Sequence, residues 1–258
     1  MNKIEVKILN PDSVFDSEKM MVCAARLTQR GHQIKSMEDF LKLYEKSYGE
    51  DLVESLVSLP HPTIQKLGVI NVAIVGASRR FLAQITRHQN EVKFISASLQ
   101  YSNYSDDAGF LIPYEILEQG DKAENKFLSN CMEEMEKYKE VVRETGEHDT
   151  AGYMAPQALR NVLIVSATPY QWKHMISQRT CKRNTAETRY IMLKIWQCLY
   201  ELEQAFFRDA GPFCMKGKCQ EKKMSCKYPI RRDITPGEII REDFSFLCKE
   251  AHNEDKGY

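Results

Sequence analysis

The sequence predicts a mixed α/β (α+β) fold in which a central sheet is flanked by helices. Residues 69–75 form a continuous, β-branched apolar run, which is typical of a buried strand. Segments with helical spacing of apolar residues stand on both sides of it, at 17–30 and 115–144. Because no internal repeat or low-complexity linker interrupts the chain, we expect one principal domain.

The first sixty residues predict one strand and two helices. Residues 4–9 alternate between polar and apolar side chains like a strand, and 17–30 carries an apolar helical stripe. A second helix is expected over 36–58, with a weak point at Gly49, and the prolines of 59–62 end it.

The buried strand is expected to lead through a turn into a helix. Gly76, Ala77 and Ser78 predict the turn, and the Ser78 hydroxyl is suited to capping a helix over 79–88. The following stretch, 89–112, is rich in serine, asparagine and tyrosine, so we expect a functional loop there.

The second half of the chain predicts further helices and an irregular tail. A long charged helix is expected over 115–144, a short strand over 163–165 and another helix over 185–207. After Gly211 the chain is basic and cysteine-bearing, and we expect irregular structure.

Composition excludes several classes of protein. The chain has 36 Lys+Arg against 36 Asp+Glu, so its surface charge does not predict nucleic-acid binding. No window approaches the roughly 18 apolar residues of a membrane span, and the N-terminus has no apolar leader-like region. We therefore expect a cytoplasmic protein with reduced thiols that binds neither nucleic acid nor membrane.

The tail cysteines raise the question of a zinc site. Cys214, Cys219 and Cys226 are separated by four and six residues, and Cys181 or Cys248 would be the fourth ligand. Zinc sites usually contain closer pairs of cysteines, so the spacing favours plain thiols, and we predict no metal site.

Two polar clusters are candidates for ligand binding. On the predicted helix over 79–88, Gln84, Arg87 and His88 would share one face, which suits a planar anionic ligand such as a nucleotide. The alternative is a solvated helix end whose cations complement the helix dipole.

In the second cluster, Arg179, Lys182 and Arg183 would precede a helix N-terminus, which also favours anions. A surface helix capped by Asn184 or Thr185 explains the same residues equally well. The chain contains no glycine-rich loop of the P-loop or dinucleotide-binding type.

Taken together, these clusters give the chain a family resemblance. The segments 76–88, 98–102 and 179–187, in this order and spacing, resemble the flavin-dependent thymidylate synthases, the ThyX family. The tail over 210–226 is similar to that of clostridial-type members. The resemblance predicts a ThyX-like domain over 1–226 and leaves 227–258 as a C-terminal extension of unknown role.

The resemblance implies a homotetramer with FAD bound where subunits meet. Such enzymes use NADPH and methylenetetrahydrofolate to convert dUMP to dTMP by reductive methylation at C5. In that chemistry an arginine polarises the pyrimidine near N3, and the matching residue is Arg179, the expected catalytic residue. Glu187 would anchor the helix beside it.

The resemblance also implies the binding residues. Residues matching the nucleotide site are Gln84, Arg87, Ser96, Ser98, Leu99, Gln100, Gly152 and Arg179. Residues matching the flavin site are Lys66, Gly68, Arg87, His88, Gln89, Ser96, Thr168, Tyr170, His174 and Arg183.

The chain departs from the family motif on the phosphate side. The usual R-H-R-x7-S-x-R-Y reads here as Arg87-His88-Gln89, eight residues and Ser98-x-Gln100-Tyr101, and Gly152 replaces another arginine. Three nearby cations could substitute for the lost ones: Arg79, Arg80 and Lys93.

Further replacements fall on the flavin side. Lys66 replaces a usual histidine, and Thr168 and Tyr170 replace an Asn and an Arg. Three functions stay open: a thymidylate synthase, a paralogue that acts on another pyrimidine nucleotide or nucleoside, and a non-catalytic subunit without cofactor.

Overall fold

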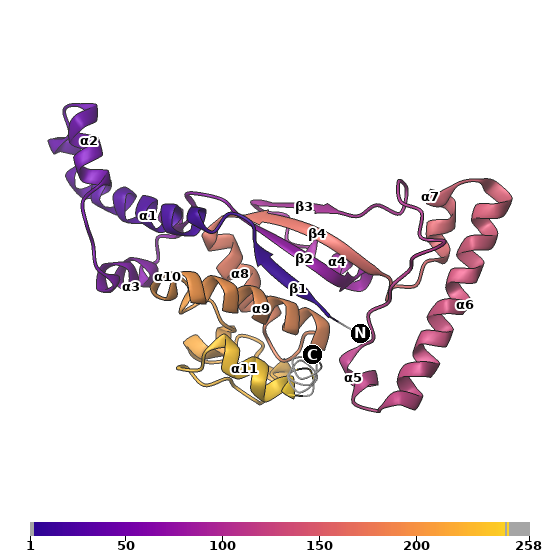
Figure 1. Cartoon of the computed structure of the whole chain (residues 1–258). Coiled ribbons are helices and arrows are strands. Elements are labelled where there is room, and N and C mark those ends of the chain that lie inside the picture. The colour runs from indigo at the N-terminus through magenta and orange to yellow at the C-terminus, as the bar shows by residue number, and fades with distance from the viewer. Residues whose placement is uncertain (1–2, 246, 248–258) are drawn as a thin grey trace, which may run out of the picture.

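The computed structural model describes residues 3–245 and 247, and a four-stranded antiparallel sheet organises this part of the chain (Figure 1). The strand order is β1-β2-β4-β3. The strands are β1 (Glu5–Ile8), β2 (Ile70–Ser78), β3 (Val92–Ser96) and β4 (Arg160–Ala167). The predicted combination of a central sheet with flanking helices is confirmed.

The predicted helix over 36–58 is in fact two helices. The N-terminal helices are α1 (Asp12–Arg30), α2 (Met37–Tyr44) and α3 (Glu50–Ser58). Ser36 and Asp39 form a reciprocal capping box that starts α2. Gly49, the expected weak point, is the N-cap residue of α3, and α2 has already ended at Tyr44.

The expected turn at 76–78 is instead a bulge inside β2. Pairing with β4 shifts register between Val75 and Ala77, and Gly76 has φ of 85°. A Cβ at Gly76 would lie 2.6 Å from the Lys3 carbonyl oxygen, so only glycine fits this bulge. The strand then continues to Ser78, whose hydroxyl accepts from the Phe81 backbone N–H at 3.1 Å.

The helix that Ser78 caps is shorter than predicted. It is α4 (Arg79–Ile85), and it ends before Arg87 and His88. The expected loop over 89–112 contains β3, which pairs along its full length with β4, from Val92 opposite Ala167 to Ser96 opposite Leu163. Serine and lysine within β3 concealed its alternating pattern.

A projecting helical unit follows the sheet edge (Figure 1). It consists of α5 (Tyr114–Leu117), α6 (Asp121–Thr145) and α7 (His148–Ala151). The predicted helix over 115–144 is interrupted by Gly120, at φ of 83°, so α6 starts at Asp121. Met135, Tyr138 and Ala151 form a small cluster separate from the main core.

The C-terminal half supplies most of the core. Its helices are α8 (Pro169–Arg179), α9 (Ala186–Leu202), α10 (Gln204–Phe207) and α11 (Pro236–Asp243). The helix predicted over 185–207 breaks at Glu203, and the tail, expected to be irregular, contains α11. Trp172 and Trp196 are fully buried, and the Trp172 indole N–H donates to the Ile70 carbonyl at 3.0 Å.

Short 3₁₀ turns complete the described structure: Gly31–Gln33, Pro62–Lys66, Gly152–Met154, Phe213–Lys216 and Lys222–Met224. Within the described ranges, no helix is long and apolar enough to cross a membrane.

Candidate functional site

Arg179, the last residue of α8, has a guanidinium that is held on three sides. Its Nε donates to His88 Nε2 at 2.8 Å and its Nη2 donates to the Gln84 carbonyl at 2.9 Å. A longer contact of 3.5 Å joins Nη1 to Asn184 Oδ1. Burial, and then the nearby Arg87 charge, lower the pKa of Arg179. The fork is therefore fixed in direction, and no carboxylate forms an ion pair with it among the described residues.

His88 is a neutral hydrogen-bond acceptor in this arrangement. Its side chain is buried, and burial, Arg179 and His174 lower the pKa of His88 to about 4. Since Nε2 accepts from Arg179, the ring proton belongs on Nδ1. His174 lies edge-on to it, with ring centroids 6.2 Å apart, and burial lowers the pKa of His174 as well.

Gln84 and Arg87 occupy different environments. The Gln84 side-chain oxygen accepts from the hydroxyls of Thr188 at 2.6 Å and Thr185 at 3.4 Å, so α9 holds it. Arg87 is exposed just beyond α4. The prediction that Gln84, Arg87 and His88 share one helical face is therefore wrong, because the helix ends at Ile85.

Glu187 anchors α9 to the sheet through Ser78. One carboxylate oxygen accepts from the Ser78 backbone N–H at 2.7 Å and the other from its hydroxyl at 2.6 Å. Burial raises the pKa of Glu187, while the two Ser78 hydrogen bonds oppose that rise. The same serine caps α4, so one residue joins β2, α4 and α9.

A cavity of about 520 Å³ at the end of β3 brings together five of the expected substrate residues. We call it the β3-end cavity; it is lined by Arg79, Ser96, Ala97, Ser98, Leu99, Gln100, Asp149, Gly152 and Tyr153. Gln84, Arg87 and Arg179 are not part of this lining. Leu99 packs onto Gly152, where an added Cβ would come within 3.1 Å of the Leu99 side chain.

The charged residues of the β3-end cavity are Arg79 and Asp149. Of the three substitute cations considered from the sequence, Arg79 is the one in its lining. Neither residue forms an ion pair within the described structure. Asp149 and Tyr153 were missed by sequence reasoning, because nothing in their local pattern marks them.

Several of the expected flavin residues lie in or next to α8: Thr168 is its N-cap residue, and Tyr170 and His174 lie within it, whereas Ser96 lines the β3-end cavity. Lys66 pairs with Glu91 at 2.8 Å and lies 5.4 Å from the centre of the Tyr170 ring. The Thr168 hydroxyl caps α8 by accepting from the Gln171 N–H at 3.3 Å.

Other members of this group are held differently. Arg183 pairs with Glu221 at 2.7 Å, Gln89 is exposed, and Gly68 has φ of 92°. Exposed Arg87 and the rings of Tyr170 and His174 suit a planar, phosphate-bearing group such as FAD.

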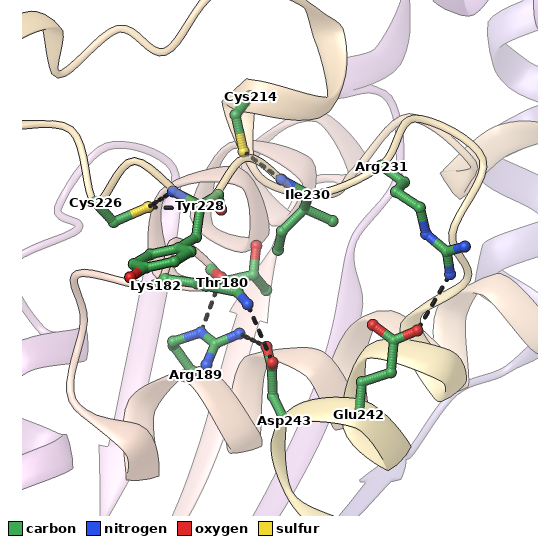
Figure 2. A network of polar contacts seen from close by, with 10 residues as sticks. All are labelled: Thr180, Lys182, Arg189, Cys214, Cys226, Tyr228, Ile230, Arg231, Glu242 and Asp243. Carbon is green, nitrogen blue, oxygen red and sulfur yellow. Dashed lines mark hydrogen bonds and ion pairs between the residues drawn. The ribbon is translucent and has the colours of Figure 1, made fainter.

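A second cavity, of about 540 Å³, separates the loop after Arg179 from the tail. We call it the tail cavity, and Cys181, Cys214, Cys219 and Cys226 all line it. Backbone N–H groups of Tyr228 and Ile230 donate to the sulfurs of Cys226 and Cys214, at 3.4 and 3.5 Å (Figure 2).

The four thiols do not form a metal site in this arrangement. In the described part of the chain, no three His, Cys, Asp or Glu side chains are placed to hold one metal ion. Cys248 lies outside the described residues. Burial is the main cause that raises the pKa of Cys181, and the neighbouring Cys226 and Cys214 raise it further.

Comparison with known proteins decides the family. The family model described as thymidylate synthase complementing protein matches residues 12–203. The chain belongs to this family. Flavin-dependent thymidylate synthases of Geobacter sulfurreducens and Clostridium tetani are both 24% identical to it. These alignments cover 82% and 86% of this chain and 89% and 93% of the relatives.

Solved structures show the same fold. ThyX from Helicobacter pylori, crystallised with FAD and dUMP, superposes with a TM-score of 0.60 at 16% identity, covering 81% of this chain and 99% of that one. The UMP/dUMP methylase PolB from Streptomyces cacaoi, bound with 5-Br dUMP, gives 0.61 at 15% identity, covering 81% and 95%. The chain is thus a divergent member of the flavin-dependent thymidylate synthase family, as its motifs predicted.

Proposed function

We propose that this protein is a flavin-dependent methyltransferase that converts dUMP to dTMP, with FAD as cofactor and NADPH and methylenetetrahydrofolate as co-substrates. The observation that carries the proposal is the fixed guanidinium of Arg179 beside the exposed Arg87, in a chain of this family. Two unneutralised cations, next to imidazoles that stay uncharged, favour anionic ligands.

In the proposed reaction, Arg179 acts on the pyrimidine ring. Its N–H donors would stabilise the negative charge that develops at the O4–N3 edge when hydride adds to C6 and makes C5 nucleophilic. C5 then bonds to the methylene carbon, the bond from that carbon to the folate nitrogen breaks, and loss of the C5 proton followed by a proton shift gives the methyl group. Reduced FAD, when bound, would supply the hydride, with NADPH as its reductant. Since His88 and the Gln84 carbonyl fix the guanidinium in advance, little reorganisation accompanies the charge change.

Ser96, Ser98 and Gln100 are proposed to contact the nucleotide in the β3-end cavity. Because Arg179 does not line this cavity, we propose that it reaches the nucleotide from a neighbouring subunit of a homotetramer. Arg87, Tyr170 and His174 are proposed to hold the flavin, with Lys66, Gly68, Gln89, Thr168 and Arg183 around them. Lys66 and Arg183 already form ion pairs with carboxylates. Arg87 would therefore supply most of the positive charge that is available to the flavin.

A second candidate is methylation of another uracil nucleotide or nucleoside. The balance of one arginine and one aspartate in the β3-end cavity favours the nucleoside, since a phosphate dianion gains little there. The structural neighbour PolB, a UMP/dUMP methylase, instead supports another uracil nucleotide.

A homotetramer is also proposed, and the open face of the sheet supports self-association. Helices α4 and α9 contact the sheet, and Ile70, Val72 and Ile74 on one face of β2 are fully buried. On the other side Val75, Val162, Ile164 and Ile95 are 38%, 47%, 38% and 69% exposed. Val75 pairs with Val162 and Ile95 with Ile164, so these side chains form one apolar patch across three strands.

The deciding experiment is a dUMP titration of the purified protein supplemented with FAD, followed by flavin absorbance and by tritium release from [5-³H]dUMP. A saturable spectral change with tritium release supports thymidylate synthase activity. Flavin binding without a response to dUMP, but with a response to UMP or deoxyuridine, favours the second candidate. Absence of flavin binding leaves a non-catalytic subunit and overturns both.

A further inference from the structure

The tail contains a partly buried ionic contact with the loop that follows Arg179. Residues beyond 203 lie outside the family match, yet Ile239, Ile240 and Phe244 of the tail are buried in the main core. A capping box between Thr235 and Glu238 starts α11, which packs along α9.

Asp243, the last residue of α11, holds two cations (Figure 2). One carboxylate oxygen contacts Arg189 Nη2 at 2.5 Å and the other contacts Lys182 Nζ at 3.1 Å. The Arg189 residue is 8% exposed, and its guanidinium lies 5.4 Å from the centre of the Phe244 ring. Both cations lower the pKa of Asp243 against the effect of burial, so the contact is charged at neutral pH.

Arg189 passes this restraint to the loop that follows Arg179. Its Nε donates to the Thr180 carbonyl at 3.2 Å, and Thr180 is fully buried. Lys182 lies in the same loop, two residues further on. Asp243 therefore fixes the loop at two points within three residues of Arg179.

The loop in turn presents Asn184 to the arginine. Asn184 Nδ2 donates to the carbonyls of Gln178 at 2.8 Å and Cys181 at 3.3 Å, while its Oδ1 faces Arg179 Nη1. A shift of the loop would remove this contact and leave the guanidinium with His88 and Gln84 alone.

We propose that Asp243 is a positioning residue for Arg179, and that the tail, through α11, fixes the loop that orients this arginine. This inference rests on the proposed function, because it assigns Arg179 the base-polarising role. Removing the Asp243 charge leaves Arg189 buried without a counter-charge and frees the loop over 180–185.

The test compares Asp243→Asn and Asp243→Glu with Glu242→Gln, a matched control on the same helix. Glu242 pairs with Arg231 at 3.1 Å and does not touch the loop. In Asp243→Asn we expect kcat to fall about ten- to a hundredfold, because a misplaced catalytic group loses transition-state stabilisation. We expect the KM for dUMP and the flavin content to change little, Asp243→Glu to recover part of kcat, and Glu242→Gln to match the wild type.

A second readout does not need turnover. The Asn184 backbone N–H donates to the Cys181 carbonyl at 3.0 Å, so its hydrogen exchange should accelerate in Asp243→Asn but not in Glu242→Gln. If wild-type protein shows no dUMP turnover, the proposed function fails, but the exchange rate of the Asn184 N–H still tests whether Asp243 fixes the loop.

Two outcomes overturn the inference: unchanged kcat and exchange in Asp243→Asn, or an equal loss in Glu242→Gln. If Asp243→Asn does not fold, Lys182→Gln removes only the more exposed arm. Folded Lys182→Gln with wild-type kcat and wild-type Asn184 exchange would then overturn it.

Discussion

Arg179 donates its Nε proton to His88 Nε2 across 2.8 Å, so a neutral imidazole rather than a carboxylate orients the guanidinium. A carboxylate at this position would neutralise the arginine and weaken its pull on an anionic transition state. With His88 in its place, the positive charge stays available to a ligand.

Replacing Arg179 should remove turnover and leave the fold intact. Arg179→Ala is expected to lower dUMP-dependent tritium release by about 10²–10³-fold, the usual effect of losing one preorganised donor. Arg179→Lys should recover little of it, since an ammonium lacks the planar fork. Wild-type turnover in Arg179→Ala, with circular dichroism unchanged, would remove Arg179 from the mechanism.

His88 should make the protein less stable in acid. Its pKa is lowered to about 4 in the folded state, whereas the unfolded chain protonates near the usual 6.5. Between these two values the unfolded state binds more protons, so the free energy of unfolding falls as pH drops from 6.5 to 4. In His88→Gln, the free energy of unfolding measured with urea should fall less steeply as the pH drops through this window. Equal slopes in both proteins would contradict the neutral-imidazole assignment.

Arg79 should distinguish a nucleotide from a nucleoside. In Arg79→Gln we expect dUMP binding to weaken about ten- to a hundredfold while deoxyuridine binding is unchanged, because one charge-assisted contact to phosphate is lost. Arg80→Gln is the neighbouring control, since Arg80 does not line the β3-end cavity. Calorimetric titration of the two ligands measures the difference, and equal losses for both would show that Arg79 does not contact phosphate.

Ser78 should matter for stability more than its size suggests. Ser78→Ala removes the α4 cap and one of the two hydrogen bonds to the partly buried Glu187 carboxylate. We expect a loss of about 2–4 kcal/mol in the free energy of unfolding. Ser58→Ala is a suitable comparison, because the Ser58 hydroxyl bonds only an exposed carbonyl one turn away. Denaturant titrations that give both variants the same midpoint would contradict the linking role.

The open face of the sheet should control assembly. Ile164→Lys puts a charge at the centre of the apolar patch, so we expect it to prevent assembly of the proposed homotetramer. Met37→Lys, on α2 and 70% exposed, should leave assembly unchanged. Light scattering distinguishes these results, and an Ile164→Lys protein with wild-type mass would place the interface elsewhere.

The sequence predicted those parts of the fold whose signals are local. The apolar run of β2, the Ser78 cap and the amphipathic α1 and α6 needed only patterns within one segment. The missed strand β3 depends on pairing with β4, a partner about seventy residues away, and its Ser96 and Lys93 resemble loop residues. The break before Arg87 also follows from tertiary contacts, because nothing between 79 and 88 opposes a helix.

The sequence named candidate site residues but did not predict how they are arranged. Motif spacing named Gln84, His88 and Arg179, yet it gave no hint that the first two would hold the third. Asp243 escaped detection for the same reason, since it lies 61 residues beyond Lys182, its partner in the loop.

The small cluster of Met135, Tyr138 and Ala151 is a second group of buried residues, separate from the main core. Gly152 and Tyr153 follow it directly, whereas Ser96 in the lining of the same β3-end cavity belongs to the sheet. A ligand in this cavity would therefore touch both the sheet and the helical unit. Because a bound ligand stabilises the parts of a protein that it joins, we expect amide exchange in α6 to slow when the cavity is occupied.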